Sequence, residues 1–172
     1  MKTIPEKLIN YSTFLNGTTY LGTADVTLPT IESLTSSVRG AGISGEIDSP
    51  TLGHYGSMTV SINWRTITKE AMQLHAPVVH QLDFRASQQS YDAAASARSR
   101  QAVRVTIKAL PKSGEIGTLD PGEGTSTTNE MEVVYLKVVV DGKTEIEIDK
   151  YNFKAVFGGQ DHLAAVRADL GL

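Results

Sequence analysis

Three carboxylates alternate along a short segment near the end of the chain and could do acid–base work or bind a cation. Glu145, Glu147 and Asp149 are spaced two apart in EIEID, so on a β-strand they share one face, with Ile146 and Ile148 on the other. Carboxylates this close suit cation binding or proton transfer. A solvated acidic face over a buried apolar one has the same pattern, and we favour that interpretation.

The four histidines do not have the spacing of a metal site. His75 and His80 are five residues apart across Pro77, not the four that would align them on one helix face. The sequence therefore favours scattered surface or interface histidines, the other two being His54 and His162. The chain has no cysteine, which removes disulfides, cysteine nucleophiles and thiolate ligands.

Two glycine motifs also fall short of the chemistry they suggest. GAGISG (40–45) partly fits a dinucleotide-binding loop, but EIDSPTLG follows it and cannot form the required helix. GHYGS (53–57) precedes a strand pattern, whereas a nucleophile elbow precedes a helix. We find no combination of nucleophile, base and orienting group. The sequence predicts no catalytic residues, no metal and no cofactor, and hence a protein that is not an enzyme.

Composition indicates an ordinary globular chain. Its 172 residues are enough for a single domain, 1–172, and 40% of them are hydrophobic and 20% charged. The formal net charge of −3 makes the whole chain a poor candidate for binding nucleic acid, which requires a basic face. No apolar run reaches the ~18 residues of a membrane span. The first residues lack the apolar core of a signal peptide, so we expect no secretion by that route.

The elements that carry these residues are predicted to be mostly β-strands. Met58, Val60, Ile62 and Trp64 alternate with polar residues, as on a strand with one buried face. The segment 103–109 alternates in the same way, with valine, isoleucine and alanine on one face. The segment 131–140 is apolar on both faces, which is typical of a central or doubly covered strand.

Turn and cap signals connect these strands and predict two short helices. Asn16-Gly17 and Asp141-Gly142 each favour a tight hairpin. Thr68 is expected to cap a helix that Pro77 stops, and Asp161 one over 162–170 that ends before Gly171. We expect Leu163, Val166 and Leu170 to form the packing stripe of that second helix. The fold class is therefore mainly β, a sandwich or barrel.

Two segments, 40–57 and 111–128, are predicted to be long loops. Their own apolar side chains are too few to keep segments of this length ordered. Ordering the first costs roughly 18–36 kcal/mol, whereas burying its four larger apolar side chains returns only about 6–12 kcal/mol. The second has only two such side chains. Each is therefore expected to be disordered alone or ordered by another surface, unless it folds back on its own barrel. The candidate contact residues are Ile43, Glu46, Ile47, Asp48, Leu52, His54, Tyr55, Ile116 and Leu119.

Extended blocks of the sequence resemble the major tail tube protein of contractile-tailed bacteriophages. These blocks are IPEKLINYSTFLNG, GAGISGEIDSPTLGHYGSMTVSINWRT and NEMEVVYLKVVVDGKTEIEIDKYNFKAVFGGQDHLAAVRADLGL. The resemblance implies a tail-tube-type β-barrel or sandwich with a short mid-chain helix, a C-terminal helix and long inter-subunit loops. It also implies hexameric rings whose sheets join into one inner barrel, and which stack into a hollow tube inside a contractile sheath.

The resemblance further implies a function and partners. The tube would conduct DNA without binding it specifically and would pierce the host envelope, from a virion tail assembled in the bacterial cytoplasm. Its partners would be its own copies, the tail sheath protein, the baseplate tube initiator, the tail terminator and the tape measure protein in the lumen. We expect 40–57 to stack the rings. The acidic stripe of Glu145, Glu147 and Asp149 would face either the lumen, whose lining we expect to be neutral or negative, or the sheath.

Two alternatives remain open from the sequence. The tube could belong to a tailocin or a related contractile injection system, since these are built from relatives of the same family. A protein of another class, a monomeric β-sandwich that holds a ligand between long loops, would have a concave pocket with converging polar groups.

Overall fold

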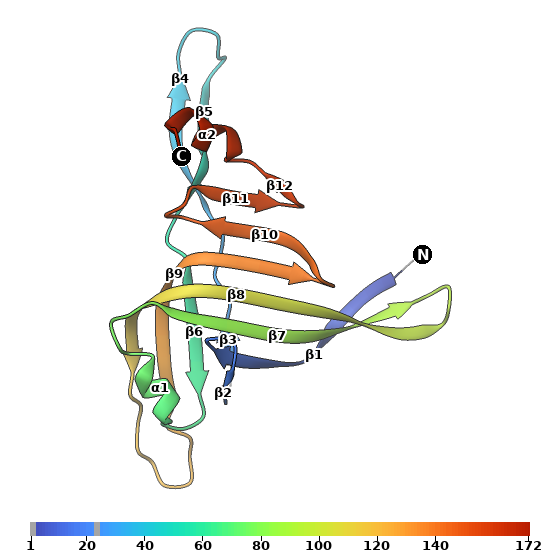
Figure 1. Cartoon of the computed structure of the whole chain (residues 1–172), viewed down its shortest axis with the longest axis vertical. Coiled ribbons are helices and arrows are strands. Elements are labelled where there is room, and N and C mark those ends of the chain that lie inside the picture. Colours follow the sequence, from blue (N-terminus) through green and yellow to red (C-terminus); the bar gives the residue numbers. More distant parts are fainter. Residues whose placement is uncertain (1–2, 23–24) are drawn as a thin grey trace.

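The computed structural model describes residues 3–22 and 25–172 and is built almost entirely from β-strands (Figure 1). Within those residues the elements in chain order are β1 (Thr3–Leu15), β2 (Thr19–Leu21), β3 (Asp25–Thr27), β4 (Ser33–Arg39), β5 (Glu46–Tyr55), β6 (Thr59–Trp64), α1 (Lys69–Gln73), β7 (His80–Asp92), β8 (Ala97–Glu115), β9 (Thr127–Val140), β10 (Lys143–Asp149), β11 (Lys154–Phe157), β12 (Gln160–Asp161) and α2 (Ala164–Leu170). The predicted mainly β class with a short mid-chain helix and a C-terminal helix is confirmed.

Most strands belong to one strongly bent antiparallel sheet. Its main order is β12-β11-β10-β9-β8-β7-β1-β2; β6 branches from β9, and β3 pairs with β6. One edge of β9 pairs with β6 over 127–132 and with β10 over 135–140, while its other edge follows β8. Figure 1 shows β6 crossing the direction of β7, β8 and β10. Strand β9 thus joins two layers of one sheet.

The core lies between these layers and is built from the alternating residues. Val60, Ile62 and Trp64 of β6 are buried, with Met58 just before them, so the predicted one-sided strand is confirmed. The alternation in 103–109 is also confirmed, since Val105, Ile107 and Ala109 are buried. Strand β9 is central, as predicted, but it is not covered on both faces, because its residues from 137 to 140 are only half-buried.

Both predicted tight turns are present. The Asn16-Gly17 turn connects β1 to β2, and both residues have positive φ, at 52° and 76°. The Asp141-Gly142 turn connects β9 to β10, with φ of 47° and 81°. Asparagine, aspartate and glycine tolerate this left-handed backbone at the least steric cost. The connection is two residues long between β9 and β10 and three residues long, 16–18, between β1 and β2.

The first helix is capped as predicted and the second is not. The Thr68 side chain accepts a hydrogen bond from Ala71 N at 3.1 Å and begins α1. Helix α2 begins only at Ala164, with Leu163 at the N-cap position, so the expected start after Asp161 is wrong. Gly171 ends α2 in the left-handed region, with φ of 74°, as expected. In the described part of the chain, neither helix is long and apolar enough to cross a membrane.

The two segments expected to be loops are largely strands, and this is a correction. Most of 40–57 is β5, which pairs with β4 from Arg39↔Glu46 to Ser33↔Tyr55. Strand β8 continues to Glu115 and β9 begins at Thr127, so the second loop is only 116–126. The estimate from the sequence counted only the burial of apolar side chains. The main-chain hydrogen bonds between the paired strands also order these segments.

A chain of polar contacts links the turn after α1 to the core and yields a prediction. Trp64 Nε1 donates to Asn129 Oδ1 at 2.8 Å, and Asn129 Nδ2 lies 3.0 Å from His75 Nε2. Asn129 is 1% exposed. We expect Asn129→Leu to lower the free energy of unfolding by about 2–3 kcal/mol, because it leaves the Trp64 N–H buried without an acceptor. Urea denaturation measures this, and an unchanged midpoint would show that the indole bond contributes nothing.

Candidate assembly surfaces

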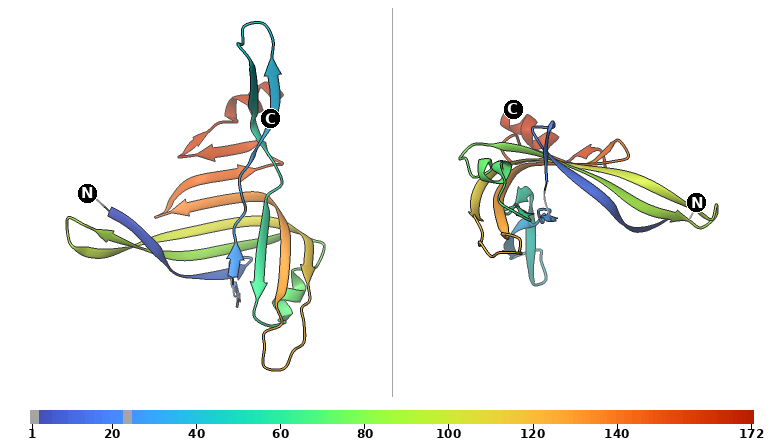
Figure 2. Two further views of the ribbon diagram at one scale, coloured as in Figure 1. Left: turned by 180° about the vertical axis from the view of Figure 1, so that it is seen from behind. Right: turned by 90° about the horizontal axis from the view of Figure 1, so that it is seen from below.

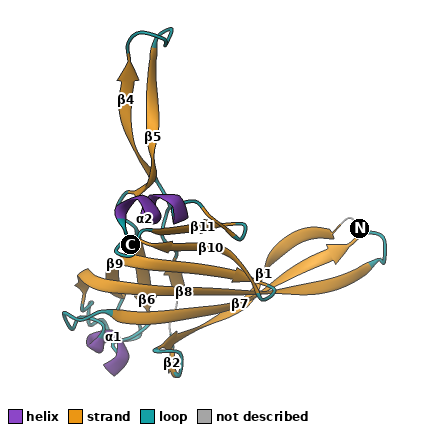
Figure 3. Ribbon diagram, turned by 45° about the horizontal axis from the view of Figure 1, so that its top comes forward, coloured by secondary structure: helices purple, strands orange, loops and turns teal. Residues whose placement is uncertain are grey.

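Strands β4 and β5 form a hairpin that stands away from the rest of the molecule (Figure 3). In its register Val38 faces Ile47 and Ser36 faces Ser49, so these residues share one face. Val38 and Ile47 are 41% and 53% exposed, and Leu34, in the irregular register at the base of β4, is 51% exposed. The hairpin therefore has an unpartnered apolar face.

The opposite face of the hairpin is polar. It carries the pairs Ser37↔Asp48 and Arg39↔Glu46, and the Ser37 hydroxyl bonds to the Glu46 carboxylate. An isolated two-stranded hairpin is marginally stable in water. A projecting hairpin with one apolar face and one charged face is thus suited to packing against another protein surface.

The predicted contact residues of the first segment fall into different parts of this hairpin. Ile43 is in the turn, where its N–H donates to Gly40 O at 3.2 Å. Ile47 is on the apolar face, and Glu46 and Asp48 are on the polar one. The sequence analysis did not include Leu34 and Val38 among the candidate contact residues. The alternation of Leu34, Ser36 and Val38 was the pattern that could have indicated a strand there.

The base of the hairpin packs against α2. A hollow of about 310 Å³ lies there, lined in part by Leu52, Gly53, His54, Leu163 and Leu170. Leu163 is 4% exposed and fills the space left by the absent side chain of Gly53, where a Cβ would lie 2.5 Å from Leu163 Cδ2. Of the predicted stripe, Leu163 is buried and Leu170 is 57% exposed.

Tyr55, the last residue of β5, packs on its own subunit. Its ring lies 6.3 Å from that of Phe157, and both rings pack against the hydrophobic core. Burial raises the pKa of the Tyr55 hydroxyl. By contrast, Leu52 is 61% exposed and His54 is also exposed. Residues of β5 that are only one to three positions from Tyr55 therefore lie on the surface.

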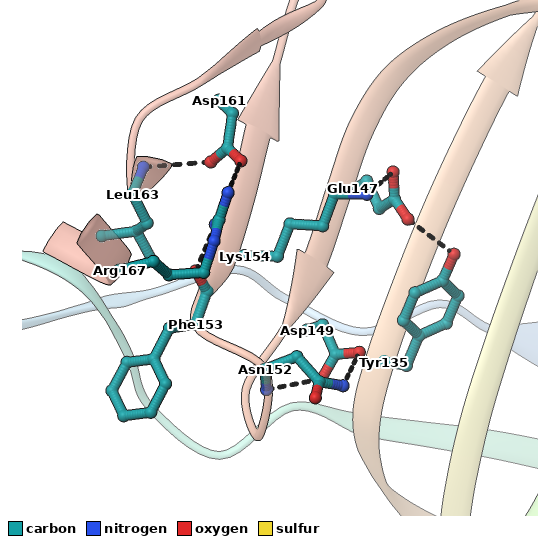
Figure 4. A network of polar contacts seen from close by, with 9 residues as sticks. All are labelled: Tyr135, Glu147, Asp149, Asn152, Phe153, Lys154, Asp161, Leu163 and Arg167. Carbon is teal, nitrogen blue, oxygen red and sulfur yellow. Dashed lines mark hydrogen bonds and ion pairs between the residues drawn. The ribbon is translucent and has the colours of Figure 1, made fainter. Parts of the chain in front are cut away.

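Arg167 fastens α2 to the sheet (Figure 4). Its guanidinium contacts Asp161 Oδ2 at 2.6 Å and donates to Phe153 O at 2.7 Å, and Asp161 Oδ1 accepts from Leu163 N at 3.0 Å. The hydrogen bond from Arg167 is the main reason that the pKa of Asp161 lies below its usual 3.8, with a smaller contribution from Leu163 N–H. The carboxylate thus stabilises α2 only when it is ionised.

This ion pair predicts an acid-sensitive contribution to stability. Because the folded pKa is depressed, the contribution is present above the unfolded pKa of 3.8 and is lost as the pH falls through the lower folded value. We expect Asp161→Asn to lower the midpoint of thermal unfolding at neutral pH by about 2–4 °C, as for a loss of about 1 kcal/mol in a partly exposed pair.

The same variant should also lose less stability than the wild type on acidification below about pH 4. Asp169→Asn is the matched control, because this carboxylate forms no ion pair within the described residues. Identical acid profiles of the wild type and Asp161→Asn would contradict the assignment.

The loop 116–126 is ordered at its base and apolar at two exposed positions. Thr118 N donates to Thr125 O at 2.8 Å, and Thr125 N donates to Arg65 O at 2.9 Å. Ile116 and Leu119 are nevertheless 63% and 83% exposed. In Figure 1 this loop lies at the opposite end of the molecule from the β4–β5 hairpin.

Each residue of the predicted acidic stripe has a partner, and Figure 4 shows those of Glu147 and Asp149. Glu145 pairs with Lys143 at 3.3 Å, and Glu147 pairs with Lys154 at 3.0 Å. Asp149 accepts from the N–H groups of Tyr151 and Asn152 in the following turn. The carboxylates are therefore partnered rather than free, and whether they face a lumen or a sheath stays a prediction.

Glu147 also bonds to a tyrosine on the neighbouring strand. Tyr135 donates its hydroxyl proton to Glu147 Oε1 at 3.0 Å. Burial acts to raise the pKa of Glu147, but the bonds from Lys154 and Tyr135 outweigh it and leave the pKa below its usual value. Burial and the Glu147 bond together raise the pKa of Tyr135 to about 12.

The histidines do not converge on a site. His80 is only 8% exposed, with Nε2 3.0 Å from Ala76 O, and His75 is half-buried against Asn129. The prediction of surface or interface histidines is therefore wrong for His80, which is buried within its own chain, while His54 and His162 are exposed. Within the described residues, no group of three histidine, aspartate or glutamate side chains has the arrangement of a metal site.

The sheet also has open edges. Strand β1 pairs with β7 along its length, but among the described residues its other edge pairs with β2 only over 13–15. Strand β12, at the far end of the sheet, is two residues long. Unpaired main-chain groups along such edges are a template for pairing with another chain.

Comparison with known proteins points to one family. The family model described as phage tail tube protein FII matches residues 5–171. The tail tube protein of Escherichia phage P2 is 28% identical over 179 residues, covering 98% of this chain and 99% of that protein.

Two solved assemblies contain chains with a partial structural likeness. A chain of the sheath–tube complex of the extracellular contractile injection system PVC in its extended state gives a TM-score of 0.49 at 12% identity, over 76% of this chain and 87% of the other. A chain of the anti-feeding prophage baseplate gives 0.43 at 14% identity, over 78% and 93%.

Proposed function

Because the chain belongs to the phage tail tube protein FII family, we propose that it is the repeating subunit of the hollow inner tube of a contractile phage tail. Six copies form a ring, rings stack into the tube, and the tube conducts DNA and pierces the host envelope. The family is one of structural tube proteins, and the proposed role requires no catalysis.

The observation that carries this proposal is the unpartnered apolar face of the β4–β5 hairpin. Leu34, Val38 and Ile47 are about half exposed on a hairpin that extends away from its own core. Contacts between a projecting element and a different surface of the next copy are head-to-tail, and such contacts close into rings or continue as filaments. We propose that the hairpin is the main stacking element between rings.

The open sheet edges support closure of the ring. In the proposed assembly, the outer edge of β1 and the edge at β12 are paired by neighbouring copies, so that the sheets join into one inner barrel. Ile116 and Leu119, exposed at the opposite end from the hairpin, make further contacts between copies. We treat 1–172 as one tube domain.

The remaining partners follow from the same role. The tube lies inside the tail sheath protein, begins on a baseplate initiator and is closed by a tail terminator, with the tape measure protein in its lumen. The protein acts in the virion tail after assembly in the bacterial cytoplasm.

Negative-stain electron microscopy of the purified chain tests the proposal. We expect rings of six copies and, at high concentration, tubes. A compact monomer at every concentration, with the hairpin folded against its own body, would contradict it and would favour a ligand-binding module instead.

A further inference from the structure

The β4–β5 hairpin is attached to the rest of the molecule by two short connections. Its strands pair with each other, and in the described part of the chain neither pairs with the large sheet. Residues 28–32 lead from β3 into β4, and residues 56–58 lead from β5 into β6. Figure 2 shows the hairpin projecting beyond the large sheet from these connections. The contacts that hold the two connections therefore determine the direction in which the hairpin points.

An ion pair of the large sheet holds the second connection. Lys150, in the turn after β10, donates to Gly56 O at 2.8 Å and contacts Glu132 Oε1 of β9 at 3.4 Å. Glu132 Oε2 accepts from the Ser57 hydroxyl at 2.5 Å, and Oε1 accepts from Met58 N at 3.3 Å. The two charged side chains thus bond to every residue of the connection. We call Glu132 and Lys150 the hairpin clamp.

The hairpin clamp lies where the two layers of the large sheet separate. Strand β9 pairs with β6 in its first part and with β10 in its second. Between these two stretches, Val133 N donates to Met58 O at 2.7 Å, and Lys150 N donates to Val134 O at 3.1 Å. Main-chain hydrogen bonds therefore fix the backbone that carries both residues of the clamp.

Both side chains of the clamp are largely covered. Those of Lys150 and Glu132 are 23% and 31% exposed. Burial acts to raise the pKa of Glu132, but the bonds from Ser57, Met58 N–H and Lys150 outweigh it, so the pKa lies below its usual 4.5 and the carboxylate is ionised at neutral pH. Hydrogen bonds to charged groups are shorter and stronger than those between neutral ones, so this pair is suited to holding a main-chain segment in place.

The other supports of the hairpin are of a different kind. Gly53 lies against Leu163, and the Tyr55 ring lies against that of Phe157. Apolar packing of this sort is not directional, whereas hydrogen bonds are. Within the base of the hairpin, the N–H of Gly56 donates to the main-chain oxygen of residue 32 at 2.9 Å. Holding the second connection therefore also holds the end of the first.

We propose that Glu132 and Lys150 fix the direction in which the β4–β5 hairpin projects, and that they are positioning residues for the stacking of copies. The clamp presents the apolar face of the hairpin in one direction before a second copy arrives. The contact then does not have to order a mobile hairpin, and preorganisation of this kind strengthens association. That the direction serves stacking rests on the proposed function, whereas the hold of the clamp on the hairpin does not.

Paired spin labels measure this direction, because the chain has no cysteine of its own. One label is attached at Ser44→Cys, in the turn of the hairpin, and the other at Lys108→Cys on β8, which is paired on both edges. Distances are measured in the protein fraction smaller than tubes. We expect a narrow distance distribution with the clamp intact. Lys150→Met should broaden it, because methionine is of similar length but cannot donate to Gly56 O.

Three further variants separate positioning from stability. Lys143→Met breaks the ion pair with Glu145 at the other end of β10 and should leave the distribution narrow. Asn129→Leu removes a buried hydrogen bond elsewhere on β9 and should also leave it narrow, although it lowers stability. Glu132→Gln should broaden the distribution as Lys150→Met does. Combining these two should broaden it no further, because residues of one network are not additive.

Tube formation is scored separately by electron microscopy. If the released hairpin points in the competent direction in about a tenth of the molecules, the concentration at which tubes form should rise about tenfold in Lys150→Met. An unchanged distance distribution in Lys150→Met, or equal broadening in Asn129→Leu, would overturn the clamp and leave the tube unaffected. A broadened distribution with tubes at the wild-type concentration would overturn the positioning role. A wild type that never forms tubes but shows the expected distances would contradict the proposed function alone.

Discussion

Replacing Val38 with lysine and Ile47 with glutamate should abolish stacking into tubes while leaving the subunit folded. The two residues face each other in the β4–β5 register, so the new side chains form an opposite-charge pair that preserves the hairpin. The same change places two charges on the apolar face, where contact with another copy would bury them at a cost of several kcal/mol. Electron microscopy and sedimentation velocity measure the loss of tubes.

The matched control places a similar pair on the other face of the hairpin. Ser37→Lys with Asp48→Glu adds charge at residues that are already polar and also face each other. We expect this variant to assemble like the wild type. Tubes of normal length from the Val38/Ile47 variant would show that the apolar face is not a stacking surface.

Gly53→Val should be the most destabilising single substitution at the base of the hairpin. Gly53 has φ of +71°, a conformation that a β-branched residue adopts only with strain, and its Cβ would lie 2.5 Å from Leu163. Backbone strain and overpacking together predict a loss of about 3–4 kcal/mol in the free energy of unfolding. Chemical denaturation measures it.

A double-mutant cycle separates the two causes. In a Leu163→Ala background the overpacking disappears and the strain remains, so Gly53→Val should there cost only about 1–2 kcal/mol. Equal costs in both backgrounds would mean that Leu163 does not determine how the hairpin is seated on α2.

Sequence alone predicted the parts of the fold that have strong local signals. The alternation at 58–64 and 103–109, the Asn-Gly and Asp-Gly turns and the Thr68 cap each specify a backbone conformation within a few residues, and all are present. The family resemblance is also confirmed.

The β4–β5 hairpin could not be predicted in this way. Strand β4 is mostly serine and threonine between Leu34 and Val38, and β5 contains Pro50 and Gly53, which usually mark breaks. Both are tolerated because this sheet has only two strands, so each strand keeps a free edge.

Strand β9 has a mechanical consequence. Its first half belongs to the layer with β6 and its second half to the layer with β10, so the two layers share one covalent backbone. Layers joined only by side-chain packing can slide over each other under load. Here, shearing one layer past the other would require simultaneous rupture of many main-chain hydrogen bonds, and a wall built from such subunits would resist compression along its length.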